Sequence, residues 1–198
     1  MPTLILIKHA LPQIDPTVPA NQWRLSEEGQ CFSRVLAQRL AQYELDLIFS
    51  SVEPKAIETA HIVATALEKR VEVVEGLHEH DRNSVEFLEK KKFEASVFQF
   101  FNQPGLLTFG NETANQAHHR FSQAVMGIIE KYPDKNIALV THGTVLTLFV
   151  SHLVGIEPFA FWKGLALPSW VVLSHPDLSL RSVCKSINNE NANGDNLS

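Results

Sequence analysis

Short apolar runs recur along this chain, and they constrain its fold more than any other feature. They are four or five residues long and rich in Val, Ile, Leu and Phe; they lie at Leu4–Ile7, Leu45–Phe49, Val71–Val74, Ile137–Val140 and Trp170–Leu173. The absence of polar alternation is typical of strands buried on both faces, as in parallel sheets. The sequence therefore predicts five buried strands.

Segments with helical periodicity separate these runs. Apolar residues recur at three- and four-residue spacing over Ser26–Tyr43, Pro54–Glu68 and Glu112–Tyr132, while Val145–Val154 is almost wholly apolar. Strands that alternate with helices predict a three-layer α/β/α domain with a mostly parallel central sheet. At 198 residues the chain fits one domain, which we place at residues 1–185.

Two segments depart from this alternation. Within residues 84–110, the part from Glu89 to Gly110 joins a lysine-rich run to five phenylalanines. We interpret 84–110 as a helical insertion over one end of the sheet, a lid; a helix that places Phe98 and Phe101 in the core is an alternative that is compatible with it. The tail 186–198 has little that can be buried, and we predict that it is disordered.

Composition excludes several classes of partner. The formal net charge is -5, whereas nucleic-acid-binding domains usually carry a basic excess, so we expect no nucleic-acid partner. The apolar stretches fall well short of the ~20 residues that span a bilayer, and Leu4–Ile7 is too short for the apolar part of a signal peptide. Cys31 and Cys184 are far apart, and we predict reduced thiols. We therefore expect a cytoplasmic protein with no membrane partner.

Polar residues gather where the predicted strands end. In α/β sheets of this type, ligands bind beyond the carboxyl ends of the strands. Those ends supply Lys8-His9, Ser50-Ser51 followed by Lys55, the segment His78–Arg82, and Thr141-His142-Gly143. Lys55 falls in the first turn of a predicted helix, where a cation opposes the helix dipole at a cost of up to ~1 kcal/mol. This placement indicates an anion nearby.

Six short motifs, taken in order, resemble the histidine phosphatase superfamily, the phosphoglycerate-mutase-like proteins. "LILIKHA" resembles that family's "LxxRHG", "WRLSEEGQ" its "LTxxG", and "FSSVEPKAIETA" its "SSxxxRAxxTA". "GLHEH" falls where the family has its acid, "FGNET" where it often has "GES", and "LVTHG" matches its second histidine motif. Three positions depart from the pattern: Lys8 and Lys55 stand where the family has arginines, and Ala10 where it has glycine.

The resemblance implies a mechanism. His9 would be the nucleophile and form a phosphohistidine, while the charge of the transferred group would be balanced by His142, Lys8 and Lys55. Glu79 would be the proton donor and then the base, with His80 and Asp81 as rivals. We expect further phosphate contacts from Arg24, Ser51 and Thr141. This chemistry needs no metal and no cofactor, and "HEH" matches no zinc motif.

Three functions stay open at this point. The first is a phosphatase acting on a phosphorylated small molecule or a phosphoprotein, and the second is a mutase that passes phosphate between two hydroxyls. The third is a phospho-ligand-binding protein with weak turnover, because a lysine lacks the planar fork with which arginine grips phosphate. The apolar segment Phe159–Leu167 is a candidate homodimer surface, and packing in the core explains its apolar character equally well.

Overall fold

A six-stranded sheet forms the centre of the computed structural model, which describes residues 1–187. The strand order is β3-β2-β4-β1-β5-β6; β1, β2, β3 and β4 are mutually parallel, and β5 and β6 continue the sheet as antiparallel strands. The strands are β1 (Thr3–Lys8), β2 (Leu47–Ser50), β3 (Val71–Val73), β4 (Ile137–Thr141), β5 (Ser169–Ser174) and β6 (Leu180–Cys184).

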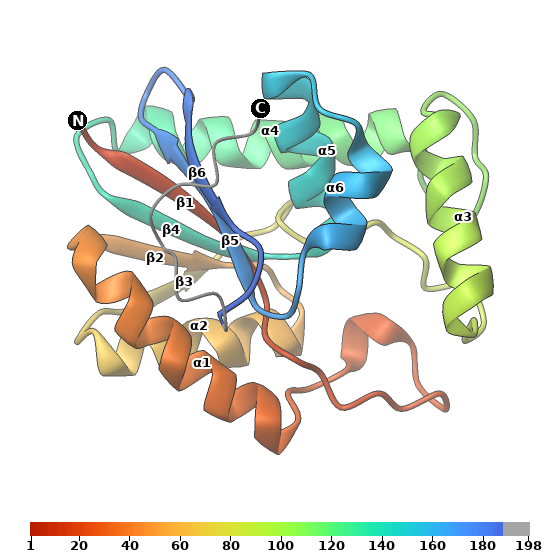
Figure 1. Ribbon diagram of the computed structural model, residues 1–198, viewed down its shortest axis with the longest axis horizontal. Coiled ribbons are helices and arrows are strands. Elements are labelled where there is room, and N and C mark those ends of the chain that lie inside the picture. The colour runs from red at the N-terminus through yellow and green to blue at the C-terminus, as the bar shows by residue number, and fades with distance from the viewer. Residues whose placement is uncertain (188–198) are drawn as a thin grey trace.

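Helices cover both faces of the sheet (Figure 1). α1 (Glu27–Leu40) and α2 (Pro54–Ala66) lie on one face, and α4 (Ala114–Lys131) and α5 (Gly143–Val154) lie on the other. α6 (Pro158–Gly164) packs on α5, and α3 (Lys90–Asn102) packs on α6. Short 3-10 turns occupy Ala20–Gln22 and Ala41–Tyr43. The predicted three-layer α/β/α domain is confirmed.

Successive residues of β1 point into different cores. Leu4 and Leu6 join the core beneath α4 and α5, whereas Ile5 and Ile7 join the core beneath α1 and α2. All four side chains are fully buried, as expected for a strand covered on both faces. β3 departs from the prediction: it is an edge strand whose Glu72 and Val73 are exposed.

Capping residues place the helix ends near their predicted positions. The hydroxyl of Ser26 accepts a hydrogen bond from the N–H of Gly29 and begins α1. Thr113 and Gln116 form a capping box that begins α4. Gly155 ends α5 in the left-handed conformation that glycine adopts without strain. The sequence missed α6, which has only seven residues, and β6, whose residues are mostly half-exposed.

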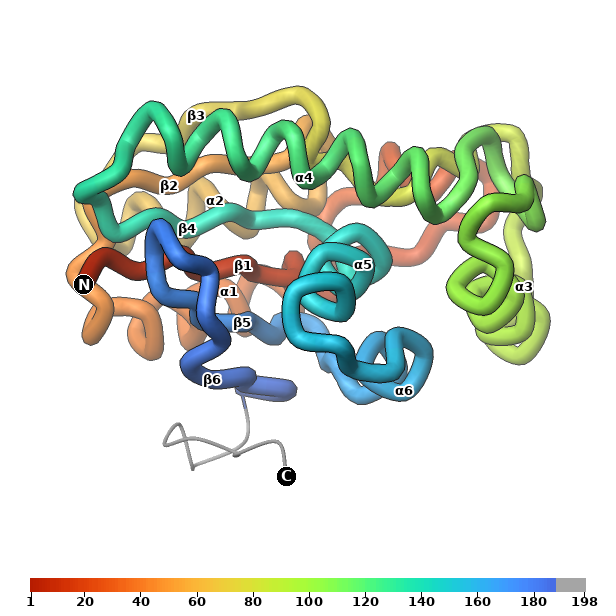
Figure 2. Tube along the Cα trace, turned by 90° about the horizontal axis from the view of Figure 1, so that it is seen from above, coloured from red at the N-terminus to blue at the C-terminus, as the bar shows by residue number. Residues whose placement is uncertain are grey.

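The predicted insertion is helical, and it stands beyond the carboxyl ends of the strands (Figures 1 and 2). Val97, Phe100 and Phe101 of α3 are buried, so the core alternative is right for Phe101. It is wrong for Phe98, which is 48% exposed and contacts the ring of Phe159. The role of this segment as a lid stays a prediction.

The remaining expectations concern the thiols, the membrane and the tail. Within residues 1–187, no disulfide joins Cys31 to Cys184. Over the same range, none of the helices combines the length and the apolar character needed to cross a bilayer. The disorder predicted for 186–198 falls, from residue 188 on, outside the described residues.

Candidate active site

His9 lies directly after the central strand β1, and its ring is fixed by its own neighbour. Its Nδ1 lies 2.7 Å from the carbonyl oxygen of Ala10. Because a carbonyl only accepts, Nδ1 carries the proton and Nε2 keeps a free lone pair. The N–H of Ala10 donates to Thr59 Oγ1 at 3.1 Å, which holds that carbonyl in place. The tautomer suits a ring that attacks through Nε2.

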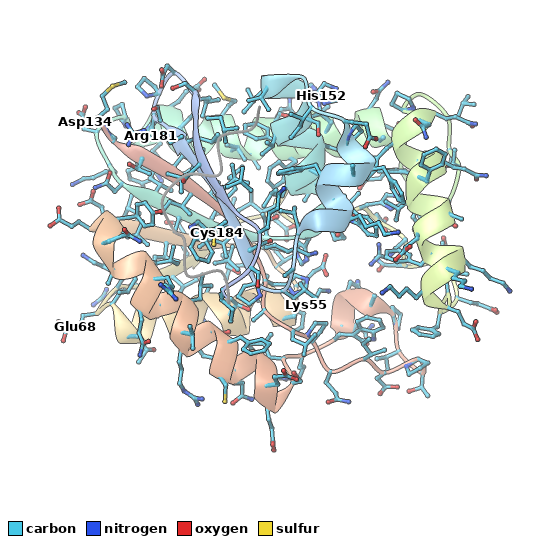
Figure 3. The ribbon with its side chains drawn as sticks, in the orientation of Figure 1. Lys55, Glu68, Asp134, His152, Arg181 and Cys184 are labelled. Atoms are coloured by element: carbon cyan, nitrogen blue, oxygen red, sulfur yellow. The ribbon has the colours of Figure 1, made fainter. Side chains whose placement is uncertain are left out.

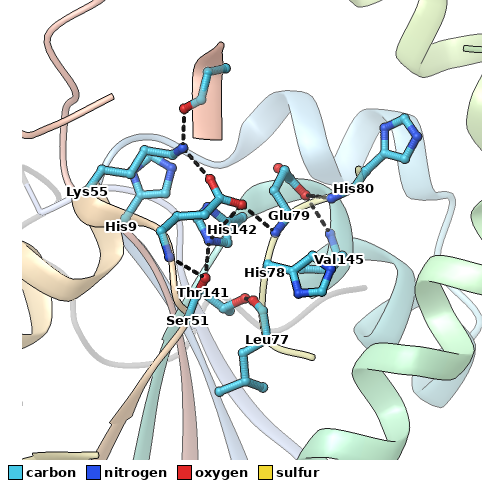
Figure 4. A network of polar contacts seen from close by, with 12 residues as sticks. His9, Ser51, Lys55, Leu77, His78, Glu79, His80, Thr141, His142 and Val145 are labelled. Atoms are coloured by element: carbon cyan, nitrogen blue, oxygen red, sulfur yellow. Dashed lines mark hydrogen bonds and ion pairs between the residues drawn. The ribbon is translucent and has the colours of Figure 1, made fainter. Parts of the chain in front are cut away.

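His142 lies beside His9 although 132 residues separate them in the sequence. It caps α5 after β4, the strand that pairs with β1, and the two ring centroids are 5.1 Å apart (Figure 4). Burial lowers the pKa of both rings well below the usual value, and nearby Lys55 lowers each further. Both imidazoles are therefore neutral at pH 7.

Lys55 comes from the first turn of α2 and is buried, with 5% of its surface exposed. Its Nζ donates to the carbonyl oxygen of Ala20 at 2.6 Å and pairs with the carboxylate of Glu53 at 2.5 Å. Figure 3 places Lys55 at the end of the sheet opposite Asp134, which precedes β4. The anion that the position of Lys55 indicated is thus present within the protein itself.

Lys8 is the last residue of β1, directly before His9. Its Nζ donates to the carbonyl oxygen of Leu165 at 2.7 Å, and burial lowers its pKa to about 8 although the charge of Glu79 acts in the opposite direction. The side chain runs close over Gly143, where an added Cβ would lie 3.0 Å from Lys8 Cε. The glycine after His142 therefore leaves room for this lysine.

Glu53 is the site residue that the sequence analysis missed. Its carboxylate pairs with Lys55, accepts the N–H of Glu79 at 2.8 Å and lies 3.6 Å from His142 Nε2 (Figure 4). These are cationic and donor groups that a phosphoryl oxygen would use. The signal was its position two residues before Lys55 and four residues after the predicted strand Leu45–Phe49, where an acid is unexpected in an anion site.

Glu79 lies at the N-terminus of α5. Its carboxylate accepts the N–H groups of His80, Thr144 and Val145 at 2.9, 3.2 and 3.3 Å. Burial raises its pKa, but electrostatic interactions with His142 and Arg82 and the hydrogen bond from the His80 N–H outweigh burial, so the net shift is downward. Glu79 is therefore an ionised carboxylate at neutral pH.

One arginine fixes the loop that carries this acid. Arg120 of α4 donates to the carbonyl oxygens of Gly76, His78 and Glu79 at 2.8, 2.9 and 3.1 Å. Its other contact is an ion pair with Glu112, at 2.5 Å. The "FGNET" segment therefore acts through Glu112 and Arg120 on the backbone of the acid loop.

The two rivals of Glu79 serve other contacts. The ring of His80 packs against Phe100 and Phe109, with centroids 4.1 and 4.8 Å away. The Asp81 carboxylate accepts the Asn83 N–H and the Asn111 amide at 3.2 and 3.1 Å. The geometry therefore favours Glu79 as the acid.

The three further predicted phosphate contacts have separate positions. Ser51 Oγ lies 2.7 Å from His142 Nε2, within the site. Thr141 Oγ1 is buried and donates to the carbonyl oxygen of Leu77 at 2.7 Å, so it connects β4 to the acid loop. Arg24 is 75% exposed, pairs with Glu58 at 2.6 Å and lines neither cavity near the site. The structure thus brings Ser51 to the histidines and leaves Arg24 at the surface.

A polar cavity of about 240 Å³ opens beside these residues. Its walls carry both signs of charge, from Glu53, Lys55, Glu79 and Arg82 among others. In residues 1–187, no three His, Cys, Asp or Glu side chains are grouped closely enough to hold one metal ion. The cavity is therefore suited to a ligand that carries charge and hydrogen-bond acceptors.

Comparison with known proteins shows the family of this chain. The family model described as "Histidine phosphatase superfamily (branch 1)" matches residues 5–185. Phosphoserine phosphatase 1 of Hydrogenobacter thermophilus is 25% identical over 174 residues, 82% of this chain and 81% of the relative. Mycobacterial glucosyl-3-phosphoglycerate phosphatase has a similar structure, with a TM-score of 0.75 at 19% identity over 93% of this chain and 99% of the other. Phosphoserine phosphatase of Entamoeba histolytica gives a TM-score of 0.76 at 21% identity over 94% and 98%. The chain belongs to the histidine phosphatase superfamily.

Proposed function

We propose that this phosphatase hydrolyses a small phosphomonoester through a phosphohistidine on His9. The observation that carries the proposal is the buried, neutral pair of His9 and His142, in which the Ala10 carbonyl leaves His9 Nε2 unprotonated. A neutral imidazole with a free lone pair is the form that attacks phosphorus. The relatives named above are phosphatases of small molecules, which favours such a substrate over a phosphoprotein and hydrolysis over mutase-type transfer.

The proposed reaction has two steps. His9 Nε2 forms a bond to phosphorus, the ester P–O bond breaks, and the leaving oxygen takes a proton from Glu79. Water then attacks the phosphohistidine, gives a proton to Glu79, and the P–N bond breaks to release phosphate. Glu79 must carry a proton in the first step, and the negative charge of a bound phosphoryl group favours this by raising the pKa of the carboxyl.

Trapping the intermediate tests the proposal. The purified protein should release phosphate from 4-nitrophenyl phosphate, and rapid denaturation during turnover should yield phosphate bound through an acid-labile, base-stable bond. Mass spectrometry of the labelled peptide should place it on residues near the N-terminus. Turnover without any covalent phosphate would contradict the phosphohistidine route.

A second candidate is the weak phospho-ligand-binding protein, and the position of Glu53 favours it. A carboxylate that pairs with Lys55 and approaches His142 competes with a bound phosphoryl group. Under this alternative the protein binds inorganic phosphate or a phosphomonoester, and neither phosphate release nor labelling exceeds that of a catalytically dead control. The trapping experiment therefore separates the two functions.

The pKa of Lys8 predicts a pH dependence. Since this pKa is about 8, the ammonium is mostly present at pH 7 and is lost as the pH rises through 8. If the ammonium stabilises the phosphoryl group, kcat/KM falls with an apparent pKa near 8. Lys8→Arg keeps its charge throughout this range, so the fall should disappear in that variant. A phosphate-release assay from pH 6 to 10 makes the measurement, and an unchanged fall in Lys8→Arg would assign it to another group.

The location of the protein, its partners and its dimerisation remain proposals. We infer a cytoplasmic location without nucleic-acid or membrane partners from the composition and thiol usage of the chain. The homodimer through Phe159–Leu167 has less support, because Phe161 and Leu165 of this segment are buried in the core of the same chain.

A further inference from the structure

A second cavity, of about 330 Å³, lies beside the polar one and has a different chemistry. It is formed by two segments, the loop between β1 and α1 and the stretch that leads into α3, which lie side by side in Figures 1 and 2. Most of its lining is apolar, including Ile14, Val18, Trp23, Val85, Phe87 and Phe93. A cavity of this size accepts a ring or a branched hydrocarbon group.

The two cavities share two lining residues. Ala20 and Arg82 line both of them. The carbonyl of Ala20 is the one that holds Lys55 Nζ at 2.6 Å, so the apolar cavity begins next to the phosphate-binding lysine. A ligand bound to the polar cavity can therefore extend past Ala20 into the apolar one.

Arg82 marks the junction and has an unused donor. Its guanidinium lies 4.5 Å above the ring of Phe93, a cation–π geometry that holds the side chain in place. Its Nη1 is buried and has no hydrogen-bond partner among the described residues. Buried guanidinium nitrogens are normally paired, so this one indicates a ligand oxygen at the junction.

Two apolar side chains that line the cavity are exposed to solvent. Phe87 is 48% exposed and Ile14 is 53% exposed, although both are large and apolar. Phe87 also approaches Trp23, with ring centroids 6.4 Å apart. Clustered exposed apolar side chains on the rim of a catalytic cavity are typical of a binding surface.

We infer that the substrate is a phosphomonoester whose alcohol part carries a bulky apolar, preferably aromatic, group. The phosphoryl group lies at His9, an oxygen of the ester faces Arg82 Nη1, and the apolar group fills the cavity beneath Trp23 and Phe87. This inference rests on the proposed function for the position of the phosphoryl group. It adds the chemical class of the alcohol part of the ester, which neither the family nor its motifs specify.

Paired probes that differ only in the apolar group test it. Benzylphosphonate and methylphosphonate resist hydrolysis, so calorimetry measures their binding whether or not the protein is active. We expect benzylphosphonate to bind about tenfold more tightly or better. Benzyl phosphate and methyl phosphate have leaving alcohols of similar acidity, and kcat/KM from phosphate release should differ in the same sense.

A matched pair of variants localises the effect. Phe87→Ala should reduce the preference for the benzyl probe about fivefold or more, and Ile14→Ala should also reduce it. Phe98→Ala is the control, because Phe98 is also 48% exposed but does not line the cavity. That control should keep the preference of the wild type.

The outcomes separate this inference from the proposed function. Equal affinity for the two phosphonates, or equal effects of Phe87→Ala and Phe98→Ala, overturns the inference even if phosphohistidine forms. A benzyl preference that depends on Phe87, in a protein that forms no phosphohistidine, supports the cavity assignment and overturns the proposed function.

Discussion

Replacing His9 with alanine is expected to abolish the phosphoenzyme and to lower kcat/KM by about three orders of magnitude or more. The Ala10 carbonyl fixes the proton of His9 on Nδ1, and burial together with the Lys55 charge keeps the ring neutral. In the neighbouring His142, Nε2 is instead engaged by Ser51 Oγ at 2.7 Å. Labelling quenched in alkaline denaturant, which preserves a phosphohistidine, and steady-state phosphate release make the measurement.

His142→Ala is the matched control for this assignment. His142 is also neutral and buried, but we assign it to stabilising the phosphoryl charge, so its loss should cost about 10²- to 10³-fold while phosphoenzyme still forms slowly. Labelling that persists in His9→Ala and vanishes in His142→Ala would reverse the two roles. Thermal unfolding of both variants checks that each is folded.

Replacing Lys55 with methionine is expected to lower kcat/KM by about 10- to 150-fold. A charge-assisted hydrogen bond to phosphate is worth ~1.5–3 kcal/mol, which corresponds to that range. The loss should lie toward its upper end, because Lys55→Met leaves the Glu53 carboxylate buried without its cation. Steady-state kinetics on one phosphomonoester make the comparison, and an unchanged kcat/KM would mean that Lys55 serves only Glu53.

Glu53→Gln should act in the opposite direction. The amide keeps the shape of the side chain but removes a negative charge near the phosphoryl position, so inorganic phosphate should bind about tenfold more tightly. In the double variant Glu53→Gln/Lys55→Met, part of the Lys55→Met loss should be recovered, since the two residues are in direct contact. Glu75→Gln is the control: Glu75 lines the same cavity but is exposed, and water screens its charge. Weaker phosphate binding in Glu53→Gln would instead mean that Glu53 orients Lys55 for the substrate.

The layers of the fold could be predicted from the sequence because strands buried on both faces are apolar at successive positions. Leu4–Ile7 is apolar at every position since both faces of β1 are covered, and the caps Ser26 and Thr113 mark where helices begin. β3 misled the same argument, because the valines of Val71–Val74 lie on an edge strand and are not fully buried. β6 was missed because its pattern has no continuous apolar run.

The sequence predicted those residues of the candidate site that follow the carboxyl ends of strands. His9, His142, Glu79 and Lys55 follow the carboxyl ends of the strands, and the parallel topology brings those ends together. Glu53 was not predictable as a partner of Lys55, because the side-chain direction at a helix N-cap depends on tertiary contacts. Arg24 was predicted as a phosphate contact, but it pairs with Glu58 of α2. This pairing depends on how α2 packs against the loop between β1 and α1, which the sequence does not show.

The two histidines follow central strands of the sheet, whereas the acid lies in a loop that follows an edge strand. His9 and His142 follow the neighbouring central strands β1 and β4, and the His9 amide donates to Thr141 within that pairing. Glu79 instead lies in a loop that follows β3, a three-residue edge strand, and depends on Arg120 for its position. Local unfolding usually begins at such edges, so amide hydrogens there exchange before those of central strands. Under mild denaturant this chain should therefore pass through a state that keeps its nucleophile but lacks its acid, in which a phosphoenzyme formed beforehand would hydrolyse slowly.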